Sequence, residues 1–275
     1  LTGTSMGGHV TLLGMHEFPT QFAGGLAMCP AGPELFDYFT AVGAAAEAIT
    51  GLRFDDPATV GDTTRKMADL LGEPPTYTDK GRQLASVEIE LSGGPRPFAA
   101  QGLRSRFLQN ISGAALAGSR TASNRAATNA HYTYRVDESL GLTSAALNAG
   151  VRRKAADSEM RGPQSPFDEV AAFDGRIEQP VLTMHGTGDL FVPIHLERTL
   201  RTAVAAAGKT DLLVQRIYRI GGHCQFSVPE QSKAFDDLVR WVREGVKPAG
   251  DDIFADFRDA GRTFTNPLRD GDPGG

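Results

Sequence analysis

The chain begins Leu1-Thr2-Gly3-Thr4-Ser5-Met6-Gly7-Gly8, a run in which small residues surround one serine. Residues 9–16 then carry apolar side chains that a helix could pack together. Gly25-Leu26-Ala27-Met28-Cys29 follows, a short apolar run bounded by Gly24 and Pro30, as is typical of a buried parallel strand. The opening therefore predicts a turn, a helix and a strand, in that order.

Strands and helices alternate again toward the other end of the chain. An apolar strand over 181–185 ends in a turn that contains Asp189, and a helix follows from about 194 to 207. A second strand over 212–220, rich in β-branched and aromatic residues, ends at Gly221-Gly222-His223. This alternation predicts an α/β fold with a parallel sheet, right-handed crossovers and functional loops at the carboxyl ends of its strands.

Cap residues mark several helix ends. Gly51 closes a helix that starts at Glu34, and Asp62 is placed to cap the next helix, which ends before Gly72. Ser227 and Glu230 have the spacing of a capping box at the start of the last helix. Apolar periodicity also predicts helices over 84–91 and 98–111, whereas the Ala-, Ser- and Gly-rich stretch 112–129 is interpreted as a loop or weak helix.

The predicted strands lie in two separate stretches, and the residues between them follow a helical pattern. We therefore expect residues 1–30 and 176–260 to form one incomplete sheet-containing core, residues 31–175 a mainly helical insertion, and residues 261–275 a tail.

Composition narrows the classes of partner. The chain has 275 residues, 40% of them hydrophobic, which is enough for one core with an insertion or for two small domains. Its net charge is -5 and no Lys or Arg stripe is visible, so neither nucleic acid nor an anionic membrane is expected. No apolar run is long enough for a membrane span. The chain begins at Leu1 rather than at Met, so a targeting segment and the localisation stay open.

Ser5, Asp189 and His223 occur in an order that suggests nucleophilic catalysis. A serine hydroxyl is a poor nucleophile at neutral pH, and it needs a base within hydrogen-bond reach and an acid that orients the base. The serine turn alone could be a tight turn or an anion site, Asp189 a turn residue, and His223 a packed loop residue. Taken jointly, a serine, an acid and a base that each follow a strand favour a catalytic triad.

These motifs resemble those of the α/β-hydrolase superfamily: Gly3-Thr4-Ser5-Met6-Gly7-Gly8, then Pro180 to Asp189 with Val192-Pro193, then Gly221-Gly222-His223. The resemblance implies that the backbone N–H of Met6 belongs to the oxyanion hole. The second donor in that family comes from a loop after an early strand, often His-Gly-Gly, and this chain has no such loop. The early strands are not in the sequence either, so we expect a missing amino-terminal segment to complete the sheet.

Two cysteines lie near the proposed site. Cys224 directly follows His223, and Cys29 ends a predicted strand on the same edge of the sheet. Tannase-like and feruloyl-esterase-like enzymes, which the chain resembles here, pair a Cys after the histidine with one just before the serine, where this chain has Thr4. Cys29 and Cys224 could be bridged if their Cα atoms lie within about 7 Å. The sequence leaves their pairing open.

The insertion falls where members of the resembled superfamily carry helical caps that shape the substrate pocket. Phe36, Tyr38 and Phe39 are therefore candidate substrate-binding residues. The alternative is that these side chains pack in the core of an amphipathic helix.

No cofactor and no metal are expected. His9 and His16 lie in the helix after the serine turn, and His185 ends a strand. His131 and His195 are interpreted as surface or lid residues. No pair of histidines has metal-ligand spacing together with a third ligand.

The sequence thus predicts a serine hydrolase that cleaves small-molecule carboxylic esters through an acyl-enzyme on Ser5. A serine peptidase of the prolyl-oligopeptidase type uses the same residue order and stays an alternative. So does a non-catalytic hydrolase-like binding domain or an inactive fragment.

Overall fold

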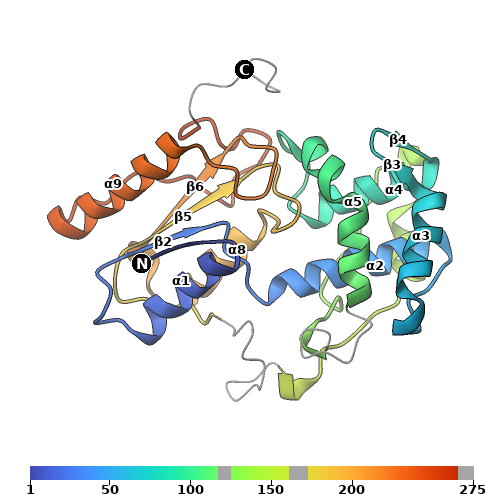
Figure 1. Ribbon diagram of the computed structural model, residues 1–275, viewed down its shortest axis with the longest axis horizontal. Coiled ribbons are helices and arrows are strands. Elements are labelled where there is room, and N and C mark those ends of the chain that lie inside the picture. The colour runs from blue at the N-terminus through green and yellow to red at the C-terminus, as the bar shows by residue number, and fades with distance from the viewer. Residues whose placement is uncertain (117–124, 161–172, 266–275) are drawn as a thin grey trace. The chain divides into compact units, whose positions relative to one another are not determined.

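Figure 1 shows the computed structural model of the protein, which describes residues 1–116, 125–160 and 173–265. Its internal contacts divide the chain into two compact units. Unit 1 comprises Leu1–Gly32, Pro95–Gly102 and Ala171–Gly275, and unit 2 comprises Pro33–Gly94 and Leu103–Val170.

Unit 1 contains a four-stranded sheet in the order β1-β2-β5-β6, in which every neighbouring pair is parallel. The strands are β1 (Thr2–Thr4), β2 (Gly25–Met28), β5 (Val181–Gly186) and β6 (Leu213–Tyr218). The predicted α/β class with a parallel sheet is therefore confirmed. Because the strands are parallel, their carboxyl ends meet at one edge of the sheet, and the loops that follow them lie together there.

Helices cover both faces of this sheet (Figure 1). Helices α1 (Met6–Glu17) and α8 (Leu196–Ala206) pack on one face, and α9 (Val228–Glu244) packs on the other. Alternate residues of a strand point to opposite faces, so Val181 joins the α1 and α8 side whereas Leu182 and Met184 join the α9 side. Apolar residues fill both interfaces, as expected for a parallel sheet.

Strand β5 is buried along its whole length, yet it carries two polar side chains. Thr183 and His185 are fully buried and share the face of Val181, on the side of α8. Buried polar groups need hydrogen-bond partners, so this face of the sheet must supply them.

The predicted caps are confirmed at two helices and wrong at a third. Ser227 and Glu230 form both bonds of a capping box at the start of α9, and Gly51 adopts a left-handed conformation after α2 (Glu34–Thr50). Helix α3 (Val60–Leu71) begins after Thr59, and Asp62 lies inside its first turn. Asp62 can therefore stabilise the helix dipole, but it is not the cap.

Unit 2 is mainly helical. Its longer elements are α2, α3, α4 (Asp79–Leu91), α7 (Ser144–Gly150) and most of α5 (Ala99–Leu116), whose first residues, up to Gly102, belong to unit 1. A short hairpin is formed by β3 (Gly72–Glu73) and β4 (Thr76–Tyr77). Single 3-10 turns lie at Pro57–Thr59, Glu138–Leu140 and Ser158–Met160 in unit 2, and at Thr210–Leu212 in unit 1. The predicted loop over 112–129 is helical as far as Leu116, and its residues 117–124 lie outside the described residues.

Two parts of the predicted domain division differ from the observed units. Residues 95–102 belong to unit 1, because Arg96 Nε donates to the Thr187 carbonyl at 2.6 Å and Gly102 packs directly against Gly188. Residues 261–265, predicted as part of a tail, pack at the end of β6: the Phe264 ring lies near that of Tyr218, and Arg219 N, just after the strand, donates to Thr265 Oγ1 at 2.8 Å. Within the described ranges, no helix combines the length and the apolar character that crossing a membrane requires.

Candidate active site

Ser5 occupies a sharp turn between β1 and α1. Its φ of 60° lies in the left-handed region, which is uncommon for a residue with a side chain. Backbone hydrogen bonds hold this conformation: Ser5 N donates to the Met28 carbonyl at 2.9 Å, and His9 N donates to the Ser5 carbonyl at 3.1 Å. The serine is therefore placed at the carboxyl edge of the sheet by a constrained backbone.

Close backbone contacts explain which glycines this turn needs. A Cβ on Gly3 would lie 2.1 Å from the Gly7 carbonyl oxygen, and a Cβ on Gly8 would lie 2.7 Å from the Met28 carbonyl oxygen. A Cβ on Gly7 would meet no atom within 4 Å. The packing of the turn therefore requires glycine at positions 3 and 8, whereas position 7 has room for a side chain.

Asp189 lies in the turn that follows β5 and is fully buried. Its Oδ1 accepts hydrogen bonds from the backbone N–H groups of Phe191 at 3.1 Å and Val192 at 2.9 Å. Its Oδ2 lies 2.7 Å from His223 Nδ1. Three donors thus fix the orientation of this carboxylate.

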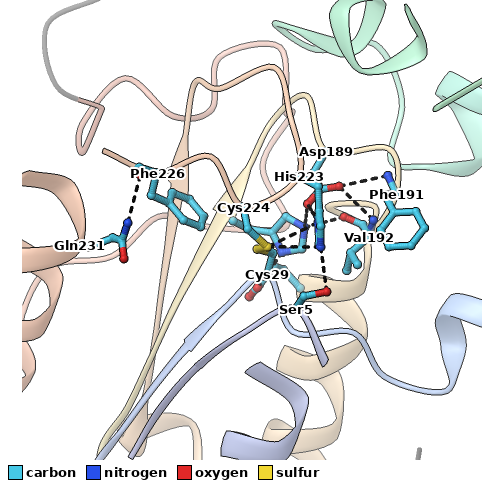
Figure 2. The surroundings of a disulfide bond; sticks show 11 residues. Ser5, Cys29, Asp189, Phe191, Val192, His223, Cys224, Phe226 and Gln231 are labelled. Carbon is cyan, nitrogen blue, oxygen red and sulfur yellow. Dashed lines mark hydrogen bonds and ion pairs between the residues drawn. A yellow bond between two sulfur atoms is a disulfide. The ribbon is translucent and has the colours of Figure 1, made fainter. Parts of the chain in front are cut away.

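His223 follows β6 and lies between the other two predicted residues (Figure 2). Its Nδ1 faces Asp189, and its Nε2 lies 2.8 Å from Ser5 Oγ. Because the carboxylate accepts a hydrogen bond, Nδ1 carries the proton and Nε2 can accept the proton of the serine hydroxyl. The structure thus brings the three predicted side chains into one hydrogen-bonded chain, with the order that a nucleophile, a base and an acid require.

A disulfide lies beside His223. Cys29 and Cys224 are bonded, with their Cα atoms 5.9 Å apart, and both residues have positive φ. The backbone N–H of Cys29 donates to the Met184 carbonyl at 2.7 Å, so one end of the bridge is fixed to β5. Cys224 Sγ lies 3.4 Å from His223 Nδ1. The pairing that the sequence left open therefore ties the loop of His223 to the end of β2.

Potential metal ligands gather at the same place. Side-chain atoms of Cys29, Asp189, His223 and Cys224 lie within 4.8 Å of one another. The two sulfur atoms are bonded to each other, and Asp189 and His223 are hydrogen-bonded to each other. This group therefore offers no thiolate to an ion while the disulfide is intact.

The remaining histidines have separate surroundings. His9 is buried in α1, and His16 Nδ1 lies 3.1 Å from the Arg176 carbonyl. His131 is exposed, and His195 is half-buried at the start of α8. His185, predicted only to end a strand, has a buried carboxylate partner that is described below.

The three candidate substrate-binding aromatic residues lie in α2 of unit 2. Tyr38 is fully buried and its hydroxyl donates to Glu88 Oε1 at 3.2 Å, so it offers no surface to a ligand. Phe39 is also buried, and the half-buried Phe36 packs against Ala126 and Met160. Their role in substrate binding stays a prediction, for which Phe36 keeps the most exposed surface of the three.

Sequence reasoning did not identify Phe191 as a neighbour of the site. Its ring packs against the His223 ring edge-on, with centroids 5.1 Å apart and an interplanar angle of 71° (Figure 2). Its place two residues after Asp189 was the available signal, because the residue two positions after a turn aspartate often donates its N–H to the carboxylate. The direction of its side chain depends on the turn, which the sequence pattern does not define.

Comparisons with known proteins give structural likenesses at low identity. No protein-family model matches the chain, and no curated protein matches it in sequence. Feruloyl esterase B from Aspergillus oryzae has 17% identity and a TM-score of 0.41, over 90% of this chain and 59% of its own. Tannin acyl hydrolase from Aspergillus niger has 14% identity and a TM-score of 0.38, over 90% and 56%.

A bacterial protein extends this group. A serine hydrolase from Cycloclasticus zankles has 17% identity and a TM-score of 0.28, over 89% of this chain and 63% of its own. This chain spans less than two thirds of the length of each of these three proteins.

Proposed function

We propose that this protein is a serine hydrolase that cleaves carboxylic esters through an acyl-enzyme on Ser5. The observation that carries the proposal is the position of His223, which lies 2.8 Å from Ser5 Oγ and 2.7 Å from Asp189 Oδ2. A hydroxyl, an imidazole and a carboxylate in this relation form the group that activates serine for attack on an acyl carbon.

Acylation begins when His223 Nε2 takes the proton of the Ser5 hydroxyl as Oγ attacks the carbonyl carbon of the ester. The carbonyl electron pair moves onto oxygen and forms a tetrahedral oxyanion, while Asp189 stabilises the imidazolium. When this intermediate collapses, the ester C–O bond breaks, and His223 returns its proton to the leaving alkoxide. The alcohol departs and the acyl group stays on Ser5.

Deacylation repeats these steps with water. His223 takes a proton from water as the water oxygen attacks the acyl carbon. His223 then protonates Ser5 Oγ as the carboxylic acid leaves. The free enzyme is thereby restored with no change in oxidation state.

The oxyanion in both steps requires hydrogen-bond donors. We assign the backbone N–H of Met6, because Met6 directly follows Ser5 and is the first residue of α1. The first N–H groups of a helix have no partner within it, and the positive end of the helix dipole favours an anion. A single oxyanion-hole donor is worth about 10²–10³ in kcat.

Labelling with a fluorophosphonate probe tests the nucleophile in the full-length protein. We expect Ser5 to be modified, Ser5→Ala to be unlabelled, and His223→Ala to be labelled far more slowly because Oγ is no longer deprotonated. Absence of labelling on Ser5 in the folded full-length protein would contradict the proposal and leave the binding-domain alternative.

The substrate class is tested separately, by comparing short-chain p-nitrophenyl esters with proline-containing amides. We expect turnover of the esters and its loss in Ser5→Ala. Preferential hydrolysis of the amides would instead support the peptidase alternative. That the helical insertion acts as a lid stays a prediction. Variants of its residues, assayed on the same esters and amides, would measure whether it selects the substrate.

A further inference from the structure

Directly behind Asp189 lies a second buried group of polar side chains that the proposed chemistry does not use. His185 on β5 and Glu197 on α8 are at most 1% exposed, and His185 Nδ1 lies 3.0 Å from Glu197 Oε1. The other carboxylate oxygen, Oε2, accepts hydrogen bonds from Thr183 Oγ1 at 2.7 Å and Gln215 Nε2 at 2.6 Å. The Glu197 carboxylate thus has three side-chain hydrogen-bond partners on the α8 face of the sheet.

The partners of His185 determine its protonation state. Its Nε2 lies 2.8 Å from the Val192 carbonyl oxygen, which can only accept a hydrogen bond, so Nε2 carries a proton. Its Nδ1 lies 3.0 Å from Glu197 Oε1, a carboxylate oxygen that accepts hydrogen bonds. Both ring nitrogens therefore donate, and His185 is an imidazolium.

Electrostatics agree with this geometry. Burial alone would lower the pKa of His185, but the hydrogen bond and charge of Glu197, with smaller effects of Asp189 and the Val192 carbonyl, raise it above its ordinary value. Among the described residues, the charged groups that face His185 are Glu197 from α8 and Asp189 from the loop after β5. Strand β6 places the apolar Ile217 beside it in register.

The same imidazolium holds the turn of the proposed catalytic acid from behind. Val192 accepts from His185 through its carbonyl oxygen and donates through its N–H to Asp189 Oδ1 at 2.9 Å. His185 Nε2 also lies 4.0 Å from Asp189 Oδ2, the oxygen that faces His223. His185 is thus linked to Asp189 in two ways, by hydrogen bonds through Val192 and by the short distance between its ring and the carboxylate.

We propose that His185 is a positioning residue for the catalytic acid: as an imidazolium held between Glu197 and the Val192 carbonyl, it fixes the Asp189–Val192 turn and partly offsets the charge of Asp189. This inference rests on the proposed function, because it assigns a role within the same site. His185 is buried, so it does not touch the substrate and acts only through Asp189.

The positive charge of His185 also acts on the Asp189–His223 pair. A positive group near Asp189 weakens the attraction between Asp189 and protonated His223, and so favours the neutral base that catalysis needs. Without that positive group, protonated His223 is favoured at higher pH. The acidic limb of the pH profile of kcat/KM then moves upward, by about 0.5–1 pH unit for a neighbouring charge of this kind.

Two substitutions separate position from charge. Glu197→Gln removes the counter-ion, so His185 becomes neutral but keeps its Nε2–H bond to Val192. We expect the acidic limb to move upward while kcat at the plateau stays within a few-fold of wild type. His185→Gln removes the positive charge and the imidazole but leaves the Glu197 carboxylate. We therefore expect a larger upward shift than in Glu197→Gln, with a kcat about 10–100-fold lower and little change in KM, because the acid is misplaced.

The control is Met184→Leu, a volume-conserving change on the neighbouring residue of β5, whose side chain points to the opposite face. It tests the effect of disturbing a buried strand, and we expect neither a shifted limb nor a large loss of kcat. If His185→Gln and Met184→Leu lose activity equally with an unmoved limb, His185 is merely structural and the proposal is overturned.

All variants are measured in the full-length protein with a p-nitrophenyl ester, together with NMR of protein labelled with ¹⁵N-histidine. In wild type we expect two downfield N–H signals from one buried imidazolium, both absent in His185→Gln. A single N–H on His185 near neutral pH overturns the inference even if a variant fails to fold. Unlabelled Ser5 in wild type overturns the proposed function and this role with it, whereas labelled Ser5 with unchanged kinetics in His185→Gln overturns this role alone.

Discussion

Cys29 and Cys224 are joined across 195 residues of sequence, and their bond connects the end of β2 to the residue that follows His223. His223, the proposed base, is therefore held from two directions, by the Asp189 carboxylate at its Nδ1 and by a covalent link through the next residue. Misplacement of a catalytic group by about 1 Å is enough to lower a rate substantially.

Removal of this disulfide is expected to cost both stability and activity. The double variant Cys29→Ala/Cys224→Ala has no bridge to restrict its unfolded chain. Its free energy of unfolding should therefore be lower than that of wild type by about 2–5 kcal/mol. Thermal unfolding with and without dithiothreitol measures the effect. Reductant should destabilise wild type and leave the double variant unchanged, and equal sensitivity of the two would contradict the assignment.

The serine turn predicts opposite outcomes at two glycines. Gly3→Ala would place a Cβ 2.1 Å from the Gly7 carbonyl oxygen, so the turn must shift and Ser5 with it. We expect a loss of several kcal/mol of stability, as is typical of severe overpacking, and loss of Ser5 labelling. The matched control Gly7→Ala adds a methyl group in open space at the start of α1 and should leave stability unchanged or raise it by up to about 1 kcal/mol. Equal unfolding midpoints for the two variants would refute this account of the turn.

Local sequence signals were sufficient to predict most strands of the sheet and the order of the candidate site residues along the chain. The strands at 25–28, 181–186 and 213–218 are apolar runs that end at turn residues, and the capping box at Ser227 depends on two residues only three positions apart. The order of Ser5, Asp189 and His223 could also be read, because each follows such a strand. Those features depend on neighbours in sequence, which a single chain displays directly.

Other features depend on contacts between distant segments, and the sequence could not supply them. The pairing of Cys29 with Cys224 requires a distance across the sheet edge, and the partner of His185 is determined by the register of α8 on β5. Residues 95–102 were placed in the helical insertion because their pattern continues a helix, whereas the Arg96 bond to the Thr187 carbonyl assigns them to unit 1. Periodicity indicates which face is buried but not which element covers it.

Phe191 is expected to support the base through its ring contact. Edge-to-face aromatic pairs contribute about 0.5–1.5 kcal/mol beyond burial, so Phe191→Ala should lower kcat/KM by roughly 2- to 12-fold. Phe235→Ala on the exposed side of α9 is the matched control and should leave kcat/KM unchanged. A normal kcat/KM in Phe191→Ala would show that the contact does not position His223.

The buried imidazolium of His185 also makes stability depend on pH. Its pKa is raised in the folded protein, against burial, by Glu197 and the neighbouring oxygens, whereas in the unfolded chain it has its ordinary value of about 6.5. The folded state therefore binds more protons than the unfolded state above that pH, so the contribution of His185 is fully present at lower pH. It is lost as the pH rises through the folded pKa, at up to about 1.4 kcal/mol per pH unit.

Urea unfolding at several pH values from 6 to 9 measures this dependence. The free energy of unfolding of wild type should decline relative to that of His185→Gln as the pH rises above neutral, so the difference between the two proteins narrows. Because titrating groups outside the pair are common to both proteins, the difference reports the coupled His185–Glu197 pair. A difference that stays constant across this range, or that widens, would contradict a charged His185 in the folded state.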